Sequence, residues 1–464
     1  MSMDYDIIII GSGPGGYVAA IRGAQLGKKV AIVERAELGG VCLNWGCIPT
    51  KALLKSAQVY EYMSRAASYG IKIGGPIEAD IPGVVARSRS VADAMSKGVS
   101  FLMNKNGIEI ITGQGKLTGE GRVTVSAGGQ TTEYSARHII LATGARPKEI
   151  PALPIDGKYI INSKQALRLD RIPKSLIVVG SGAIGCELAY YFATFGSKVT
   201  VVEYLPNMLP LEDEDVSKYM ERSFRKLRAT VMTSTSVKSA NIVNGKCKVV
   251  VESKKGAQEL ESDMVLSAVG ISSNIEELGL EDVGISVSKG KVEVDEFYRT
   301  NIAGIYAIGD IVPEPALAHV ASAEAICCVE RICGLNPSPI DYSVIPSCIY
   351  TSPEVASVGL TEKLAIEKGY EVRVGRFPFT ASGKAAAAGN RDGFVKLISD
   401  AASGELLGAH MVGANVTEMI SEITLAKNTK ATIDDLLHTI HPHPTMSEAI
   451  MEAAEDVFGQ AIHI

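Results

Sequence analysis

Two cysteines lie five residues apart in the stretch GGVCLNWGCIPTKALLK, residues 39–55. On one continuous helix, residues five apart are separated by roughly 8.7 Å at Cα, beyond the roughly 7 Å that a disulfide spans. The sequence therefore predicts that Cys42 lies outside regular helix if the pair is to form a disulfide. Gly39, Gly40 and Gly46 permit the sharp backbone turns that this requires.

Cys47 is predicted to be the more reactive thiol of the two. Pro49 is tolerated only in the first turn of a helix, so a helix should begin near Cys47. The partial positive charge at a helix N-terminus favours a thiolate, and Lys51, one turn later, adds a cation. Three readings remain open from these residues alone: two packed free thiols, half of a metal site, or a redox pair. The metal reading is the weakest, because the spacing is not C-x2-C and no second cluster of ligand spacing follows.

Composition describes an ordinary folded protein. The chain has 464 residues, 46% of them hydrophobic and 21% charged, which suffices for three or four domains with ample core. A net charge of −6 argues against nucleic acid or an anionic membrane as the main partner. An apolar strand begins almost at Met1 and no apolar run is long enough to span a membrane, so we expect a cytoplasmic protein. The 8 cysteines are scattered, so a disulfide here is expected to be catalytic rather than structural.

An internal repeat organises the first two thirds of the chain. YDIIIIGSGPGGYVAAIRGAQLGKKVAIVER and SLIVVGSGAIGCELAYYFATFGSKVTVVEY both read as strand, glycine turn, helix and strand. Glu34 and Glu203 each follow the first glycine of their turn by 23 residues. Such glycines let the backbone approach a pyrophosphate at a helix N-terminus, and the acid can accept a hydrogen bond from a ribose. The repeat therefore predicts two dinucleotide sites, with the glycine fingerprints Gly11, Gly13, Gly16 and Gly180, Gly182, Gly185.

The expected fold class is α/β, with two doubly wound dinucleotide-binding domains, a central segment and a C-terminal α+β domain. Each repeat closes with an apolar strand that ends in small residues, HIILATGARP from His138 and DMVLSAVGISSN from Asp263. In the central segment, Asp310 follows an apolar strand and suits a ligand hydroxyl, although capping of a turn explains it equally well. The predicted domains are 1–147, 148–274, 275–345 and 346–464.

A second group of reactive residues lies near the C-terminus, in HTIHPHPTMSEAIMEAA, residues 438–454. His443 stands between two prolines, and Glu448 follows it by five residues, so the carboxylate could fix the ring tautomer and raise its basicity. Thr445 and Glu448 also fit a capping box for the helix that follows. His441 could equally be the base.

Taken together, these residues resemble the class I pyridine nucleotide disulfide oxidoreductases over nearly the whole chain. GGVCLNWGCIPTK is similar to that family's active-site disulfide segment and HPHPTMSE to its base motif. The resemblance implies that Cys42 and Cys47 form a redox-active disulfide, in which Cys42 exchanges with a substrate dithiol and Cys47 faces a flavin. It also implies that His443 and Glu448 act as the base. Thr50 stands where many members have serine, which keeps a hydroxyl at that position.

The resemblance implies FAD in the first site and NAD in the second, with no metal. The residues expected to contact FAD are the first glycine fingerprint with Glu34, Lys51, Gly115, Thr143, Gly144, Asp310, Ala316, Leu317, Ala318 and His319. The residues expected to contact NAD are the second fingerprint with Glu187, Glu203 and Gly270.

The activity implied is oxidation of protein-bound dihydrolipoamide to lipoamide with reduction of NAD to NADH. The implied assembly is a homodimer in which each base serves the disulfide of the other subunit. The implied partners are lipoyl domains and the core acyltransferase of 2-oxo acid dehydrogenase complexes, or the glycine cleavage system. We expect the lipoyl group to come from such a partner.

Two other readings of the same architecture are less well supported. Glutathione and mercuric reductases work from NADPH, but Glu203 would repel a 2′-phosphate and no arginine follows it in EYLPNMLP. The final residues FGQAIHI also lack the cysteine pair expected of a mercuric reductase. A flavin-bearing docking subunit without activity is disfavoured because both the cysteine pair and the base motif are intact.

Overall fold

The apolar run YDIIII near the N-terminus forms β1 (Tyr5–Ile10), an inner strand of a largely parallel sheet. The computed structural model describes residues 3–119, 121–313 and 315–464. In it, β1 pairs in parallel with a strand on each side and is almost entirely buried, which is why the run is continuously apolar. The sheet order is β3-β2-β1-β6-β5-β4, and β19 also pairs with β6. The other strands are β2 (Val30–Glu34), β3 (Glu109–Thr112), β4 (Gln114–Gly119), β5 (Arg122–Ala127), β6 (Gln130–Leu141) and β19 (Ile305–Ala307).

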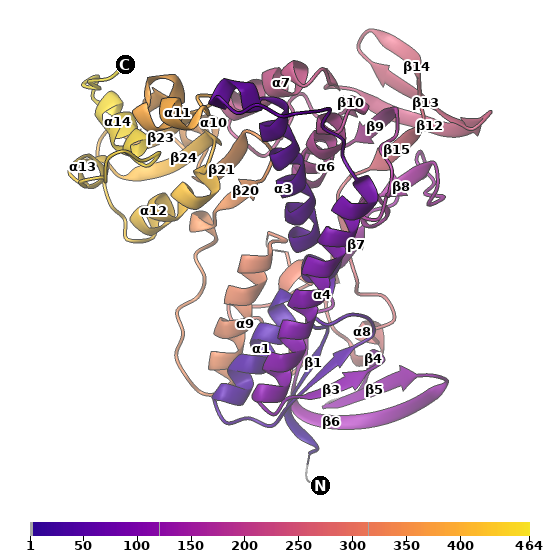
Figure 1. The fold of residues 1–464 in the computed structure, drawn as a ribbon. Coiled ribbons are helices and arrows are strands. Elements are labelled where there is room, and N and C mark those ends of the chain that lie inside the picture. Colours follow the sequence, from indigo (N-terminus) through magenta and orange to yellow (C-terminus); the bar gives the residue numbers. More distant parts are fainter. Residues whose placement is uncertain (1–2, 120, 314) are drawn as a thin grey trace. The chain divides into compact units, whose positions relative to one another are not determined.

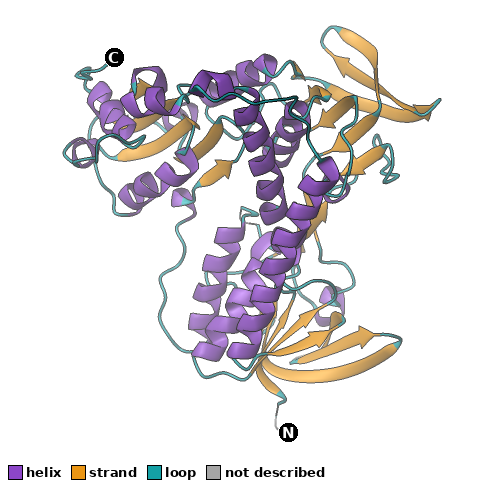
Figure 2. Ribbon diagram, in the orientation of Figure 1, coloured by secondary structure: helices purple, strands orange, loops and turns teal. Residues whose placement is uncertain are grey.

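The chain divides into two units, each made of three segments. Unit 1 comprises Met1–Ala52, Pro82–Lys148 and Gly270–Ile340. Unit 2 comprises Leu53–Ile81, Glu149–Val269 and Asp341–Ile464. Both units mix helices and strands (Figure 2).

Three helices share one hydrophobic core with the sheet of unit 1. Helices α1 (Pro14–Gln25) and α9 (Ala318–Ile332) pack against each other (Figure 1). With α4 (Ile81–Lys105), they enclose the side chains of Ile7 and Ile9 from β1. The shorter elements of this unit are β7 (Ala145–Pro147), β16 (Ile271–Ser273), α8 (Leu280–Val283), β17 (Val287–Ser288) and β18 (Lys291–Val292).

The second copy of the repeat forms a five-stranded parallel sheet in unit 2, in the order β11-β10-β9-β15-β8. A three-stranded antiparallel sheet, β12-β13-β14, shares a core with it through Val249 and Val251. The elements are β8 (Ile160–Asn162), α5 (Ser163–Ala166), β9 (Ser175–Val179), α6 (Ala183–Thr194), β10 (Lys198–Val202), α7 (Glu214–Lys226), β11 (Thr230–Met232), β12 (Ser236–Val243), β13 (Lys246–Ser253), β14 (Gly256–Ser262) and β15 (Met264–Ser267).

The C-terminal part of unit 2 is an antiparallel sheet covered by helices, in the order β20-β21-β24-β23-β22. Helix α12 packs on β21 and β24, and α14 packs on β22 and β23. The α/β class, with two parallel sheets and this α+β part, is confirmed. The elements are β20 (Ser347–Ile349), β21 (Glu354–Gly359), α10 (Glu362–Glu367), β22 (Val372–Pro378), α11 (Gly383–Ala388), β23 (Phe394–Asp400), β24 (Leu406–Gly413), α12 (Val416–Asn428), α13 (Ile433–Leu437) and α14 (Glu448–Val457).

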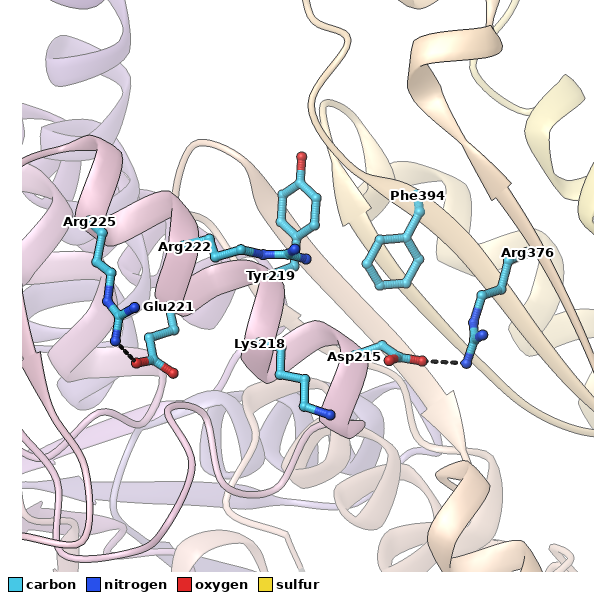
Figure 3. A pocket seen from close by; sticks show the side chains of 8 residues that line it. All are labelled: Asp215, Lys218, Tyr219, Glu221, Arg222, Arg225, Arg376 and Phe394. Carbon is cyan, nitrogen blue, oxygen red and sulfur yellow. Dashed lines mark hydrogen bonds and ion pairs between the residues drawn. The ribbon is translucent and has the colours of Figure 1, made fainter. Parts of the chain in front are cut away.

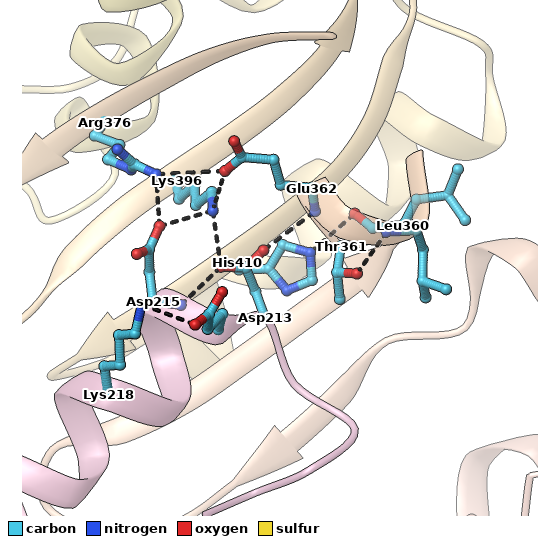
Figure 4. Close-up of polar contacts among 11 residues, drawn as sticks. Asp213, Asp215, Lys218, Leu360, Thr361, Glu362, Arg376, Lys396 and His410 are labelled. Atoms are coloured by element: carbon cyan, nitrogen blue, oxygen red, sulfur yellow. Dashed lines mark hydrogen bonds and ion pairs between the residues drawn. The ribbon is translucent and has the colours of Figure 1, made fainter. Parts of the chain in front are cut away.

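A buried lysine joins α7 to the antiparallel sheet (Figure 4). Lys396 on β23 is only 2% exposed, and its ammonium contacts Asp213 at 2.8 Å, Asp215 at 2.7 Å and Glu362 at 2.7 Å. Burial alone would lower the pKa of Lys396, but its hydrogen bonds to the three carboxylates outweigh burial and hold that pKa above its usual value. Because Asp213 also caps α7, this charge cluster fixes the start of that helix.

An open groove of about 500 Å³ lies beside this cluster and is lined by residues of α7 together with Arg376 and Phe394 (Figure 3). Two of its cations pair with carboxylates of the lining: Arg376 pairs with Asp215 at 2.6 Å, and Arg225 pairs with its neighbour Glu221 at 2.5 Å. The lining nevertheless holds four cations, Lys218, Arg222, Arg225 and Arg376, against the two carboxylates Asp215 and Glu221, so the groove carries a net positive charge. Among the residues described, no helix is both long and apolar enough to cross a membrane.

Candidate active site

The two cysteines lie on two short helices separated by a break. Cys42 belongs to α2 (Gly40–Trp45), and Cys47 is the first residue of α3 (Cys47–Ser64). Between them, Gly46 adopts φ −145° and ψ −113°. The predicted helix start at Cys47 is confirmed, but the prediction that Cys42 lies outside helix is wrong. The chain breaks at Gly46 instead, and this break brings together two cysteines that a continuous helix would keep apart.

The cysteines form a hydrogen-bonded pair of free thiols. The hydrogen bond to Cys47, together with burial, raises the pKa of Cys42 far above that of an ordinary thiol, although nearby Lys51 opposes the shift. Cys42 is therefore the protonated donor and Cys47 the acceptor. This is the arrangement of a reduced redox pair, with negative charge favoured on Cys47 at the helix N-terminus.

Helix α4 holds the backbone on both sides of this break. Three consecutive side chains, Arg87, Ser88 and Arg89, donate hydrogen bonds to backbone carbonyl groups of the cysteine segment. Their acceptors, in the same order, are the carbonyls of Ala52, Pro49 and Asn44, at 2.9, 2.9 and 2.6 Å. These three residues were not predicted, because nothing in the sequence pattern of α4 indicates which segment the helix packs against.

The two glycine turns have nearly the same geometry. Gly11 has φ +102° and Gly180 has φ +99°, and a Cβ on either would lie 2.3 Å from a backbone oxygen. By contrast, a Cβ on Gly13 or Gly182 would meet nothing within 4 Å. These two glycines are the N-caps of α1 and α6, and no side chain among the described residues caps either helix. Each turn therefore leaves open space in front of unpaired helix N–H groups, which fits a pyrophosphate.

The carboxylate that ends each second strand supports its glycine turn. Glu34 accepts hydrogen bonds from the backbone N–H and the hydroxyl of Ser12, at 2.9 and 2.6 Å. Glu203 accepts the same pair from Ser181, both at 2.8 Å. These serines were not predicted, although a serine follows the first glycine in both copies of the repeat.

The other residues expected at the FAD site all lie in unit 1. Asp310 lies in a 3-10 turn after β19. Burial raises the pKa of its carboxyl group, and the positive charge of Lys291 partly opposes this shift. Ala316 to His319 lead into the first turn of α9. Thr143 donates to the carbonyl of Asn274 at 2.6 Å, Gly144 has φ +67°, and a Cβ on Gly115 would press on Ile10 and Val33. Glu324, which was not predicted, accepts from the N–H of Gly309 at 2.6 Å.

The residues expected at the NAD site fall mostly in unit 2. Glu187 on α6 is buried and accepts a hydrogen bond from the N–H of Tyr350 at 3.0 Å. Gly270 follows β15 with φ +106° and is the first residue of the third segment of unit 1.

His443 and Glu448 form a hydrogen-bonded dyad in unit 2. Nδ1 of His443 lies 2.8 Å from Oε1 of Glu448, and the other oxygen of Glu448 accepts from the N–H of Thr445 at 2.8 Å. Burial raises the pKa of Glu448, but these hydrogen bonds outweigh burial and hold that pKa below its usual value. With Nδ1–H donating to a carboxylate, Nε2 carries the lone pair, and nothing among the described residues hydrogen-bonds to it. The side chain is 78% exposed, so this nitrogen can accept a proton from an incoming thiol.

The predicted capping box is wrong. The N-cap of α14 is Ser447, and the hydroxyl of Thr445 donates to the carbonyl of Pro442 at 2.8 Å instead of accepting from the helix. Glu448 does receive the N–H of Thr445, so half of the motif is present.

Comparison with known proteins decides the family. Residues 5–325 match the model for pyridine nucleotide-disulphide oxidoreductases, and residues 345–454 match the dimerisation domain of the same family. The chain belongs to the pyridine nucleotide-disulphide oxidoreductase family. This confirms the resemblance noted from the cysteine segment and the base motif, and with it a flavoprotein oxidoreductase that uses FAD and NAD.

Members of this family that resemble the chain align over its whole length. The dihydrolipoyl dehydrogenase of Rhizobium etli is 47% identical and that of Bacillus subtilis 43% identical, each over 100% of both chains. Among solved structures, LpdA from Mycobacterium tuberculosis superposes with a TM-score of 0.90 at 29% identity, covering 97% of this chain and 99% of that one. The flavoprotein disulfide reductase RclA of Escherichia coli, solved as a Cu(II) complex, superposes with a TM-score of 0.88 at 26% identity, covering 98% and 99%.

Proposed function

We propose that this chain is a dihydrolipoyl dehydrogenase, which oxidises dihydrolipoamide carried on a partner protein and reduces NAD to NADH. The observation that carries the proposal is the hydrogen-bonded pair of Cys42 and Cys47 across the break between α2 and α3. Two cysteines can cycle between free thiols and the disulfide that exchanges with a dithiol substrate only if the fold holds them close together. The dihydrolipoyl dehydrogenases that align over the full chain favour this substrate over other disulfides.

The glycine turns fit the two cofactors that this reaction requires. The open space beside Gly13 suits the pyrophosphate of FAD, and the open space beside Gly182 suits that of NAD. When bound, FAD accepts the electron pair from the dithiol centre and NAD receives it as hydride. The protein's own contribution is to hold both dinucleotides at helix N-termini and to position its thiols and its base.

The thiols and the base carry out the exchange in a fixed order. A substrate thiol loses its proton to Nε2 of His443 and attacks Cys42 Sγ, which breaks the Cys42–Cys47 bond and leaves Cys47 as the thiolate. The second substrate thiol then attacks the sulfur bonded to Cys42 and displaces Cys42, and its proton passes to the departing Cys42 thiolate. The substrate leaves as a cyclic disulfide, and the enzyme holds the two electrons as the Cys42 thiol and the Cys47 thiolate. Glu448 stabilises the imidazolium that forms on His443.

The activity and the nucleotide preference are tested together in one assay. Purified enzyme is expected to reduce NAD with dihydrolipoamide as donor and to use NADP with kcat/KM about 100-fold lower, because the buried carboxylate of Glu203 repels a 2′-phosphate. Glu203→Gln, which keeps an acceptor for Ser181, should narrow the difference. Absence of turnover with dihydrolipoamide would reject the function, whereas equal efficiency with both nucleotides would reject only the role of Glu203.

The finer assembly that we propose is a homodimer in which each base serves the other subunit's disulfide. The match of residues 345–454 to a dimerisation domain supports the homodimer, and His443 lies within this region. The partners proposed are lipoyl domains and the core acyltransferase of 2-oxo acid dehydrogenase complexes, or the glycine cleavage system, in the cytoplasm.

Mixing two inactive variants tests the shared site. In a two-fold dimer, one Cys47→Ser subunit and one His443→Gln subunit give one site with both changes and one native site. Unfolding and reassembling an equal mixture should make about half of the dimers hybrid and restore about one quarter of wild-type activity. If the base acted within its own subunit, no activity above the parents would return, even with hybrids confirmed by mass spectrometry.

A further inference from the structure

His441 is held between two acceptors, unlike its neighbour His443. Its Nδ1 lies 2.9 Å from the carbonyl oxygen of Thr439, and its Nε2 lies 2.8 Å from Oε1 of Glu422 on α12. A carbonyl oxygen and a carboxylate can only accept hydrogen bonds, so both ring nitrogens carry a proton. The side chain is 3% exposed, against 78% for His443.

This geometry makes His441 an imidazolium without a lone pair to offer a substrate. The hydrogen bond to Glu422 raises the pKa of His441 above its usual value and outweighs burial, and the nearby charge of Glu448 acts in the same direction. The alternative that His441 is the base is therefore not supported. Of the two histidines proposed as base from the sequence, His443 is therefore the one with an available nitrogen; both lie in the base loop, residues 438–447.

The same contacts tie the base loop to the rest of unit 2. The loop leaves α13 at His438 and enters α14 at Glu448, and the bond from His441 to Glu422 anchors its middle to α12. The positive charge of His441 also helps to lower the pKa of Glu448, the carboxylate that orients His443. The charged groups that face His441 are thus Glu422 and Glu448.

We propose that His441 is a positioning residue for the reaction, a charged clamp that holds the base loop on α12 and keeps Glu448 ionised beside His443. The inference rests on the proposed function, because its effect is expected on the dithiol reaction. Reduction of ferricyanide by NADH, which needs the flavin and the nucleotide but no proton transfer from a dithiol, should not depend on it.

Two substitutions separate the hydrogen bonds of His441 from its positive charge. His441→Leu removes the hydrogen bonds and the charge, and is expected to lower kcat with dihydrolipoamide by about 10- to 100-fold. The reason is that a shift of the base His443 by about 1 Å can cost up to about 100-fold in rate. Glu422→Gln can turn its amide N–H toward Nε2 while Nδ1–H still donates to Thr439, so His441 becomes neutral in the same place. This variant should keep most of the plateau kcat.

The pH profile then reports the charge. Glu422→Gln removes both charges of the pair, but the charge that acts on Glu448 is that of His441. Without that cation Glu448 binds its proton more tightly, so the acid limb of the profile should move to higher pH in Glu422→Gln. If the contact of His441 with Glu422 were purely structural, its loss would lower the plateau value of kcat without shifting the acid limb of the pH profile. His438→Leu, in the same loop, is the matched control and should leave both the plateau and the acid limb unchanged. Within the described residues, the hydrogen bond of the His438 ring is to the carbonyl of Asp434 at 2.7 Å.

The outcomes are distinct. Wild-type turnover of dihydrolipoamide by His441→Leu, or an unmoved acid limb in Glu422→Gln, would overturn the proposal. If His441→Leu also lost the ferricyanide reaction, through failure to fold, the limb in Glu422→Gln alone would decide. An inactive wild-type enzyme would instead reject the proposed function itself.

Discussion

His443→Gln is expected to lower kcat with dihydrolipoamide by about 10²- to 10⁴-fold, the usual contribution of general base catalysis. Glutamine is similar in size and can still donate to Glu448, but it has no nitrogen that accepts a proton. Because Nε2 of His443 is the nitrogen left available by the Glu448 contact, loss of the base should act on the dithiol step alone.

Reduction of ferricyanide by NADH is the internal control for this variant and should continue at close to the wild-type rate. His438→Gln replaces an exposed histidine of the same loop and should leave both reactions unchanged. If His443→Gln retained wild-type turnover of dihydrolipoamide, or lost both reactions equally, His443 would not be the base.

Lys396→Met is expected to reduce the free energy of unfolding by about 3–5 kcal/mol, because it leaves the buried carboxylate of Asp213 without its cation. Lys363→Met on neighbouring α10 is the matched control. Its side chain is 81% exposed and its ammonium lies 3.8 Å from Glu367, so the change in the free energy of unfolding should stay within about 0.5 kcal/mol. Denaturant midpoints at equal protein concentration and with excess FAD compare the two.

The deficit of Lys396→Met should also depend on pH. Burial raises the pKa of Asp213 and of Asp215, but the hydrogen bonds from Lys396 and the nearby positive charges together outweigh burial and hold both pKa values below their usual value. Their contribution to stability is therefore complete above the unfolded pKa of about 3.9. That contribution is lost as the pH falls through their folded pKa values. The difference between wild type and Lys396→Met should therefore be constant near neutral pH and shrink in acid. A difference that grew on acidification would contradict the role of the charge cluster.

The sequence predicted well whatever depends on local pattern. Periodicity and glycine spacing placed α1 and α6 after their turns, and Pro49 placed the start of α3 at Cys47. The prediction was wrong for the residues before Gly46, which could be either irregular or helical. A glycine between two cysteines indicates a break, but not that the residues before it, including Cys42, also turn into helix.

Contacts between distant segments could not be predicted from one sequence. The bonds from Arg87, Ser88 and Arg89 to the cysteine segment, and from Glu422 to His441, join residues whose neighbours in sequence give no sign of the pairing. The choice between His441 and His443 as base was open for the same reason. It depends on which nitrogen already has an acceptor, and the fold brings that acceptor from another helix.

Anaerobic titration of the purified yellow enzyme with dihydrolipoamide, followed by NAD, tests the central claim most directly. Two-electron reduction should produce a long-wavelength absorption band from the Cys47 thiolate beside the flavin, and NAD should remove the band as NADH forms. Cys47→Ser should never show the band, whereas Cys42→Ser should show it without reductant. A colourless protein, or a band that persists in Cys47→Ser, would contradict the assignment of Cys42 and Cys47 as the redox pair of this enzyme.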